Sequence, residues 1–185
     1  MTAAEFLADH GQRLVEVRRD LHAHPELSRE ERRTTQCVGD ALSHVGLEPR
    51  LLPGTGLICD VGPTAPTVAL RADLDALPIP DTKDVSYRSR VDGVAHACGH
   101  DVHTAAVLGA GLVLAAQAAR GELPGRVRLL FQPAEEVLPG GALDVIAAGG
   151  LDGVGRIFAL HCDPRTTVGR LALRVGPITA ASDLV

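Results

Sequence analysis

The sequence predicts an α/β fold, a three-layer αβα sandwich around a mainly parallel mixed sheet. Short aliphatic runs alternate with longer segments whose apolar residues recur at helical spacing, which is typical of strands joined by helices. Polar clusters follow several of the expected strands, as they do in open α/β sheets that bind ligands at the carboxyl ends of strands. A chain of 185 residues is long enough for one domain with a buried core.

Two amphipathic helices are expected first along the chain. Residues 3–22 carry apolar side chains at roughly helical spacing, and Pro25 ends that helix. Ser28 and Glu31 have the spacing of a capping box, so we expect them to begin the second helix. Gly46 is expected to cap its carboxyl end.

Strands and helices alternate in the rest of the chain. The expected elements are, in order, strands at 56–62 and 67–75, a helix at about 101–119, a strand at 126–131, a helix at 142–150 and a strand at 156–161. Residues 76–98 are expected to form a long irregular loop. Residues 104–119 are apolar but short for a membrane span, which favours a buried helix. Residues 168–185 resemble one or two further strands whose last residues continue into structure beyond the chain.

Composition excludes several functional classes. Hydrophobic residues make up 45% and charged residues 22%, so a disordered chain is not expected. A net charge of -5 with no basic run argues against nucleic acid as a partner, and we expect no membrane association. The first residues contain acidic groups and no apolar run typical of a signal peptide. We therefore expect a cytoplasmic protein whose four cysteines are free thiols or ligands.

Four polar clusters contain the residues that could carry chemistry. They span 71–75, 96–103, 132–136 and 161–163. Three of them follow expected strands and the fourth leads into a helix, so they can converge at one edge of the sheet.

The residue types in these clusters suit a metal centre. Cys98 and His100 can face one cation, and a thiolate, an imidazole and a carboxylate together favour Zn, Mn, Co or Ni over Mg or Ca. Of the adjacent Glu135 and Glu136, one can bind metal while the other stays free. A free carboxylate beside an activated water is the arrangement needed for hydrolysis.

Each cluster also has a simpler interpretation when it is taken alone. A Cys-x-His pair is often incidental, paired glutamates often lie in a solvated loop, and His161 could be a core histidine. Asp73 and Asp75 could cap a turn. Their combination at strand ends favours the metal site, while the motifs of thioredoxin-like proteins, zinc deaminases, phosphate-binding loops and serine hydrolases are missing.

At these clusters the sequence resembles the M20 metallopeptidase and amidohydrolase family. The branch that it resembles includes hippurate hydrolases, N-acyl-amino-acid amidohydrolases and auxin-conjugate hydrolases. The motifs that carry the resemblance are LHAHPEL at 21–27, LRADLDALP at 70–78, HACGHDVHT at 96–104, FQPAEE at 131–136 and LH at 160–161.

The resemblance implies a role for each residue. Cys98, His100, Glu136 and His161 would bind metal, with two ions in the complete site. Glu135 would be the general base, and Asp75 would be the catalytic acid that orients a ligand. Asp73, Asp101 and His103 would support the ligands from behind.

The resemblance also predicts a larger protein. Residues 1–185 would be the N-terminal portion of the catalytic domain, without the lid and dimerisation domain and without the later part that supplies a last histidine ligand. The full-length form would then hydrolyse a small N-acyl amino acid and could form a homodimer through the lid. The alternative is a truncated remnant, or a partial subunit, that binds metal weakly without catalysis.

Overall fold

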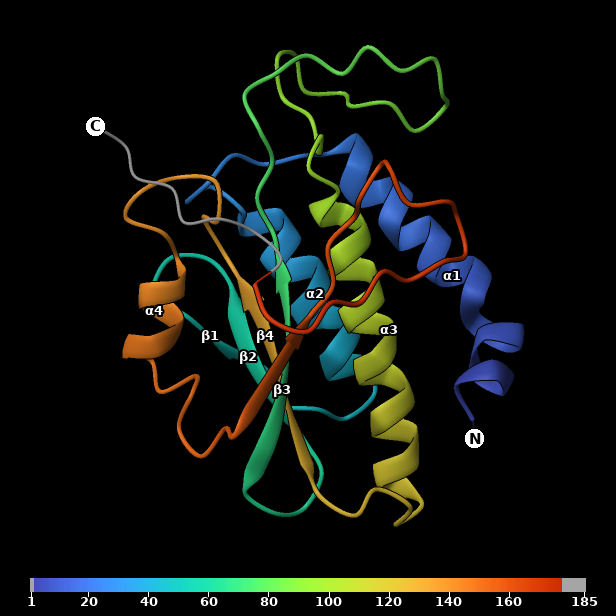
Figure 1. The fold of residues 1–185 in the computed structure, drawn as a ribbon, viewed down its shortest axis with the longest axis vertical. Coiled ribbons are helices and arrows are strands. Elements are labelled where there is room, and N and C mark those ends of the chain that lie inside the picture. The colour runs from blue at the N-terminus through green and yellow to red at the C-terminus, as the bar shows by residue number, and fades with distance from the viewer. Residues whose placement is uncertain (1, 178–185) are drawn as a thin grey trace.

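The computed structural model describes residues 2–177, and within them the chain forms four helices and five strands (Figure 1). The helices are α1 (Ala3–Ala23), α2 (Arg32–His44), α3 (His100–Ala119) and α4 (Ala142–Ala147). The strands are β1 (Arg50–Leu51), β2 (Leu57–Val61), β3 (Pro66–Asp73), β4 (Arg126–Gln132) and β5 (Arg156–Ala159).

The strands form one mixed sheet in the order β1-β2-β4-β3-β5. β2 is antiparallel to both of its neighbours, whereas β3 is parallel to β4 and to β5. The last residues of β3 and β4, Asp73 and Gln132, face each other in the register. The segments that follow these two strands therefore leave the sheet at the same edge.

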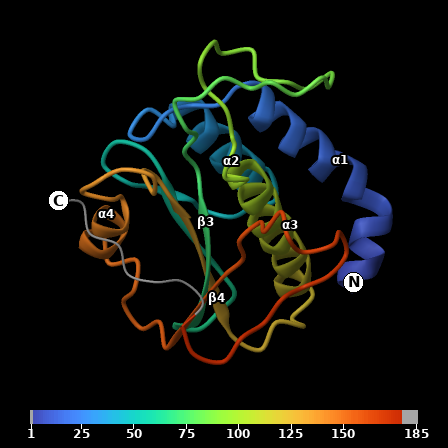
Figure 2. The ribbon, with the colours of Figure 1, turned by 45° about the horizontal axis from the view of Figure 1, so that its top comes forward.

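Helices cover both faces of the sheet, which confirms the expected three-layer αβα fold (Figures 1 and 2). α2 and α3 pack on one face, with α1 against α3, and α4 lies on the other face. Because successive strand residues point to opposite faces, the neighbours Leu129 and Leu130 belong to two different cores.

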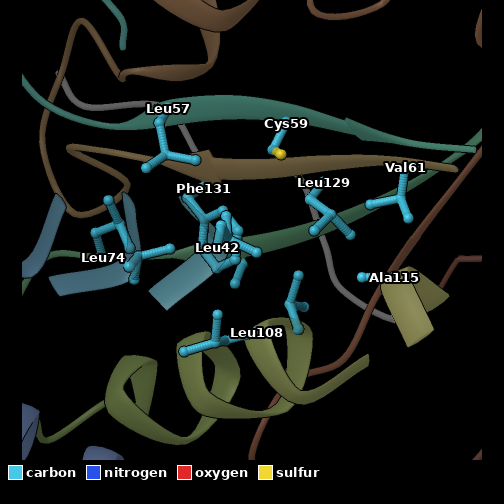
Figure 3. Packing of buried hydrophobic residues seen from close by; sticks show 12 residues of the cluster. Leu42, Leu57, Cys59, Val61, Leu74, Leu108, Ala115, Leu129 and Phe131 are labelled. Atoms are coloured by element: carbon cyan, nitrogen blue, oxygen red, sulfur yellow. The ribbon is translucent and has the colours of Figure 1, made fainter. Parts of the chain in front are cut away.

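The larger core lies between the sheet and helices α2 and α3. Figure 3 shows Leu57, Leu129 and Phe131 of the sheet on the side that faces Leu42 of α2 and Leu108 of α3. All five side chains are almost completely buried. This core fixes α3 against the sheet, and the first turn of α3 carries His100.

The helix α3 is the apolar segment for which a buried position was expected. Its length and composition alone would allow it to cross a membrane, and 50% of its most apolar window is buried inside the fold. Its buried face packs on the sheet, so the prediction of a core helix is confirmed.

The capping box predicted at Ser28 and Glu31 is wrong. α2 begins at Arg32 with Glu31 as its N-cap residue, and the side chain of Glu31 makes no capping hydrogen bond. Glu26 instead accepts the amide hydrogens of Arg33 and Thr34 in the first turn of the helix. The Ser28 hydroxyl instead donates to Asp75 at 2.6 Å. Both side chains of the predicted box have tertiary partners, which compete with a local cap for the same oxygen atoms.

One further prediction about the elements is wrong, and one strand was not predicted. Residues 168–177 form no strand, and Val168, Leu171, Leu173 and Val175 are nearly fully exposed there. A strand needs a neighbour for its backbone hydrogen bonds, and no described strand pairs with these residues. The predicted continuation over 178–185 lies outside the described residues. The short strand β1 was not predicted, because two residues are too few for a periodic pattern.

Leu42→Ala is expected to lower the free energy of unfolding by about 2–5 kcal/mol, because it leaves a cavity in the larger core. Leu7→Ala on α1 is the matched control, since Leu7 is 54% exposed, and its effect should stay within about 0.5 kcal/mol. Urea unfolding followed by circular dichroism measures both. Equal effects for the two variants would contradict this description of the core.

Candidate metal centre

The candidate site lies at the edge of the sheet where β3 and β4 end. Asp73 is the last residue of β3, and Asp75 follows two residues later. Glu135 and Glu136 lie in the turn just after β4, and His100 is the first residue of α3. The parallel pairing of β3 and β4 therefore brings these groups together, as the sequence predicted.

His100 is held with one ring nitrogen free. Its Nδ1 donates to the backbone oxygen of Asp75 at 2.9 Å, so in the neutral imidazole Nε2 carries the lone pair. Nε2 is 3.7 Å from Glu136 Oε1, 3.8 Å from an oxygen of Asp73 and 3.9 Å from Glu135 Oε2. This is how metal-binding histidines are usually held, with the second nitrogen fixed by a carbonyl or a carboxylate.

The electrostatics around His100 favour a positive charge. Burial disfavours the charged imidazole, but the hydrogen bond with Asp75 and the nearby Asp73 and Glu136 raise the pKa of His100. Carboxylates that attract a proton to a buried site also attract a metal cation.

Cys98 and His161 form the second half of the cluster. Cys98 Sγ lies 3.3 Å from His161 Nε2, and His161 Nδ1 donates to the backbone oxygen of Cys162 at 2.8 Å. One ligand atom each from Cys98, His100 and His161 lies within 4.8 Å of the others. Burial, with added repulsion from Glu136 and Glu135, raises the pKa of the Cys98 thiol to about 12. The thiol is therefore protonated at neutral pH unless a cation stabilises the thiolate.

The two glutamates differ in their surroundings. The side chain of Glu136 is 21% exposed and that of Glu135 is 39% exposed. Burial and the neighbouring Asp73 and Glu136 raise the pKa of Glu135. Glu135 thus combines access to solvent with a raised proton affinity, which a group that exchanges protons with a substrate requires.

Asp75 connects the ligands to the scaffold. It is fully buried, and one oxygen accepts hydrogen bonds from Ser28 at 2.6 Å and from the amide of Glu136 at 3.0 Å. Burial alone would raise the pKa of Asp75, but the hydrogen bonds from His100, Ser28 and the turn after β4 outweigh it and keep that pKa well below its usual value. The structure thus places Asp75 against His100, and its role as an acid that orients a ligand stays a prediction.

Asp73 and His103 lie closer to the cluster than a purely supporting role requires. Asp73 Oδ2 is 3.6 Å from His103 Nδ1, and one atom each of Asp73, His100 and His103 lies within 4.8 Å of the others. Asp73 is also paired with Arg71, and His103 Nε2 accepts the amide hydrogen of Cys162. Asp73 and His103, which were expected to support the ligands, therefore form a candidate metal-binding group together with His100.

Asp101 lies on a different side of α3. Its carboxylate is 2.7 Å from His22 Nδ1 and 2.8 Å from Arg18 Nε, both on α1. Nε2 of His22 is 3.2 Å from Asp81, in the loop before the metal-ligand motif. Among residues 2–177, these ion pairs of Asp101 therefore run to α1, away from the candidate metal ligands.

Several buried polar atoms of the cluster have no hydrogen-bond partner among the described residues. They include His100 Nε2, His103 Nδ1 and Glu136 Oε1. A buried nitrogen or carboxylate oxygen without a partner is costly, and a cation between these atoms would satisfy them. The residues present therefore fit a divalent transition metal.

Solved structures show the class of protein to which this arrangement belongs. A structure from Bacillus subtilis, the YXEP protein described as a dinuclear metal binding peptidase from the M20 family, superposes with a TM-score of 0.78 at 44% sequence identity. That match covers 85% of this chain and 44% of the other. The aminobenzoyl-glutamate utilization protein of Klebsiella pneumoniae gives a TM-score of 0.68 at 27% identity, covering 88% and 46%.

The chain belongs to peptidase family M20/M25/M40, whose family model matches residues 69–182. It is 43% identical over 175 residues to an N-acetylcysteine deacetylase of Bacillus subtilis, covering 92% of this chain and 45% of that protein. It is 60% identical over its whole length to a Rhodococcus jostii protein provisionally named glutamate–cysteine ligase 2-3, of which it covers 23%. The chain thus spans less than half the length of these relatives.

Sequence reasoning missed the contribution of Ser28 and Glu31 to the site. Glu31 accepts hydrogen bonds from the amide of Ala134, beside the two glutamates, and from Thr55. The spacing of Ser28 and Glu31 matched that of a capping box. Spacing along the chain carries no information about Ala134, which lies 103 residues after Glu31.

His96 is expected to make the folded protein acid-sensitive. Its ring is buried, neither nitrogen has a partner among the described residues, and burial lowers its pKa to about 4. Between its unfolded pKa of about 6.5 and about 4, the unfolded chain binds a proton that the folded protein does not, so stability falls as the pH falls.

The contribution of His96 has a maximum slope of about 1.4 kcal/mol per pH unit. His96→Leu should therefore flatten the pH dependence of the free energy of unfolding between pH 6.5 and 4. His10→Leu, the same substitution on the exposed side of α1, is the matched control for the replacement of a histidine by leucine. An unchanged curve for His96→Leu, measured by urea unfolding, would contradict a buried neutral imidazole.

Proposed function

We propose that this protein hydrolyses the amide bond of N-acyl amino acids or related small amide and peptide conjugates, with a divalent transition metal as cofactor. The observation that carries this proposal is the convergence of Cys98, His100, Glu136 and His161 beside a second, more exposed glutamate. Family membership and the names of the N-acetylcysteine deacetylase and N-acyl-L-amino acid amidohydrolase relatives support it.

In this proposal Cys98, His100, Glu136 and His161 hold the metal, with two ions in the complete site. A bound divalent metal acidifies water and polarises the carbonyl of an amide. Glu135 takes the proton of the attacking water and returns it to the leaving amine, which its exposure and raised pKa allow. Asp75 orients His100, while Asp73 and His103 support the ligands.

Thiolate and imidazole ligands favour zinc, manganese, cobalt or nickel. A last histidine ligand, substrate-binding groups from a lid and a homodimer are implied by the family resemblance, and they stay predictions. A cytoplasmic location remains a prediction as well. The alternative, a weak metal binder without catalysis, predicts that no amino acid is released in the assay below.

The full-length protein should hydrolyse members of a panel of N-acetyl, N-benzoyl and longer N-acyl amino acids after loading with Zn, Mn, Co or Ni. N-acetylcysteine belongs in the panel because two relatives are named for its deacetylation. Release of the free amino acid is the measurement. A metal-loaded protein that releases none would favour the non-catalytic alternative.

Glu135→Gln is expected to lower kcat by about 10²- to 10⁴-fold, because the amide side chain cannot accept the proton. Its metal content should match that of the wild type. Glu136→Gln is the matched control, since the same change at the neighbouring carboxylate should reduce metal content. Loss of metal in Glu135→Gln, measured by elemental analysis, would reverse the assignment of the two glutamates.

Cys98→Ala is expected to weaken metal binding by more than about tenfold, because it removes the thiolate ligand. With Co²⁺ as the probe, the variant should also lose the sulfur-to-cobalt charge-transfer absorption. Cys37→Ala, a half-buried thiol on α2, is the control and should keep both properties. An unchanged cobalt spectrum in Cys98→Ala would remove Cys98 from the ligand set.

A further inference from the structure

Glu31 is a fully buried carboxylate at the N-terminus of α2. Its Oε1 accepts the amide hydrogen of Ala134 at 2.7 Å, and its Oε2 accepts the hydroxyl of Thr55 at 2.6 Å. Burying a carboxylate is costly, so these short contacts to its two oxygens are substantial interactions. The contact with Ala134 lies directly before Glu135, in the turn that carries both glutamates.

The turn that receives Glu31 has an unfavourable backbone conformation. Ala134 is buried and has a φ of 50°, in the left-handed region that residues with a side chain rarely adopt. Such a conformation persists only where the surroundings hold it, and it often occurs at functional sites. The residues that follow Ala134 are Glu135 and Glu136, so this backbone determines where both carboxylates lie.

Other contacts from the same short segment reach this turn. Ser28 binds the Asp75 oxygen that also accepts the amide of Glu136. Arg29 donates to the backbone oxygen of Pro139 at 2.7 Å and pairs with Asp144. Residues 28–31, between α1 and α2, therefore contact both sides of the turn, and Glu31 makes the contact that lies directly before Glu135.

We propose that Glu31 is a positioning residue, which holds the Ala134 amide so that Glu135 and Glu136 keep the orientation needed for proton transfer and metal binding. This inference rests on the proposed function, but it concerns a residue outside the metal cluster. A residue that only stabilises the fold would change stability without changing the turn.

Glu31→Met tests the proposal, because Met keeps the volume and removes both acceptor oxygens. Glu31→Gln is the conservative rescue. Its single oxygen can accept from Ala134, and its amide can donate to the Thr55 hydroxyl. Thr55→Val removes the other partner of Glu31 while leaving the Ala134 contact, so it is the matched control for stability alone.

The double variant Glu31→Met, Thr55→Val separates stability from positioning. It removes the hydroxyl that Glu31→Met leaves buried without a partner, so it should be more stable than Glu31→Met. It still lacks the contact with Ala134 and should keep the defect in the turn. It also replaces Glu31→Met if that variant does not fold.

Readouts on the full-length protein are hydrogen exchange of the peptide containing residues 132–137, Co²⁺ affinity, and kcat and KM on the best substrate of the panel. Glu31→Met and the double variant should exchange at least about tenfold faster in this peptide, bind Co²⁺ more weakly and lose about 10- to 100-fold in kcat. KM should stay within about threefold of the wild-type value. Glu31→Gln should recover most of each loss, and Thr55→Val should lower Tm without changing kcat.

Wild-type exchange in the turn of Glu31→Met would overturn the proposal. So would recovery of kcat in the double variant, or a loss of kcat in Thr55→Val as large as that in Glu31→Met. If the wild-type protein hydrolyses no member of the panel, the proposed function fails, and hydrogen exchange with Co²⁺ affinity still decides the role of Glu31.

Discussion

The parallel pairing of β3 with β4 is the constraint on which the site depends. Their register places Asp73 opposite Gln132, so the segments after both strands leave the sheet at one edge. The large core then fixes α3 against the same sheet, with His100 at the edge where the strands end. A slip in this register would move the carboxylates after the strands away from the histidine and break the hydrogen bond between His100 and the backbone oxygen of Asp75.

The cost of this arrangement is electrostatic. Asp73, Glu135 and Glu136 all lie within 3.9 Å of His100 Nε2. Burial and the negative charge of these neighbours raise the pKa of Glu135 and of the Cys98 thiol. Arg71, which pairs with Asp73, compensates for part of this negative charge. A divalent cation would compensate for the rest and would satisfy the buried atoms that lack a partner among the described residues. The folded chain is thus organised for a positive charge at this edge of the sheet.

Residues outside the candidate metal ligands hold those ligands and the two glutamates in position. His100 and Glu136 are held through Asp75, the turn after β4 is held through Glu31, and Asp101 links α3 to α1 and to the loop at Asp81. Three segments far apart in sequence therefore position a small number of side chains. Rigid support of this kind is what general acid and base catalysis requires, because small displacements of the reacting groups are costly.

The local sequence pattern determined the long helices and strands and the residue types of the candidate site. The aliphatic runs and the helical spacing predicted the long elements within a few residues of their ends. The types of residue at Cys98, His100, Glu136 and His161 indicated a transition metal. Only the tertiary structure decided which polar groups meet. Ser28 and Glu31 have the spacing of a helix cap yet bind partners across the sheet, and Asp101 neighbours His100 in sequence yet points toward α1. Residues 168–177 have the composition of a strand without a neighbour to pair with among the described residues. The reason is physical: periodicity and residue type act within a few residues, whereas hydrogen-bond partners and strand neighbours are set by how the layers pack.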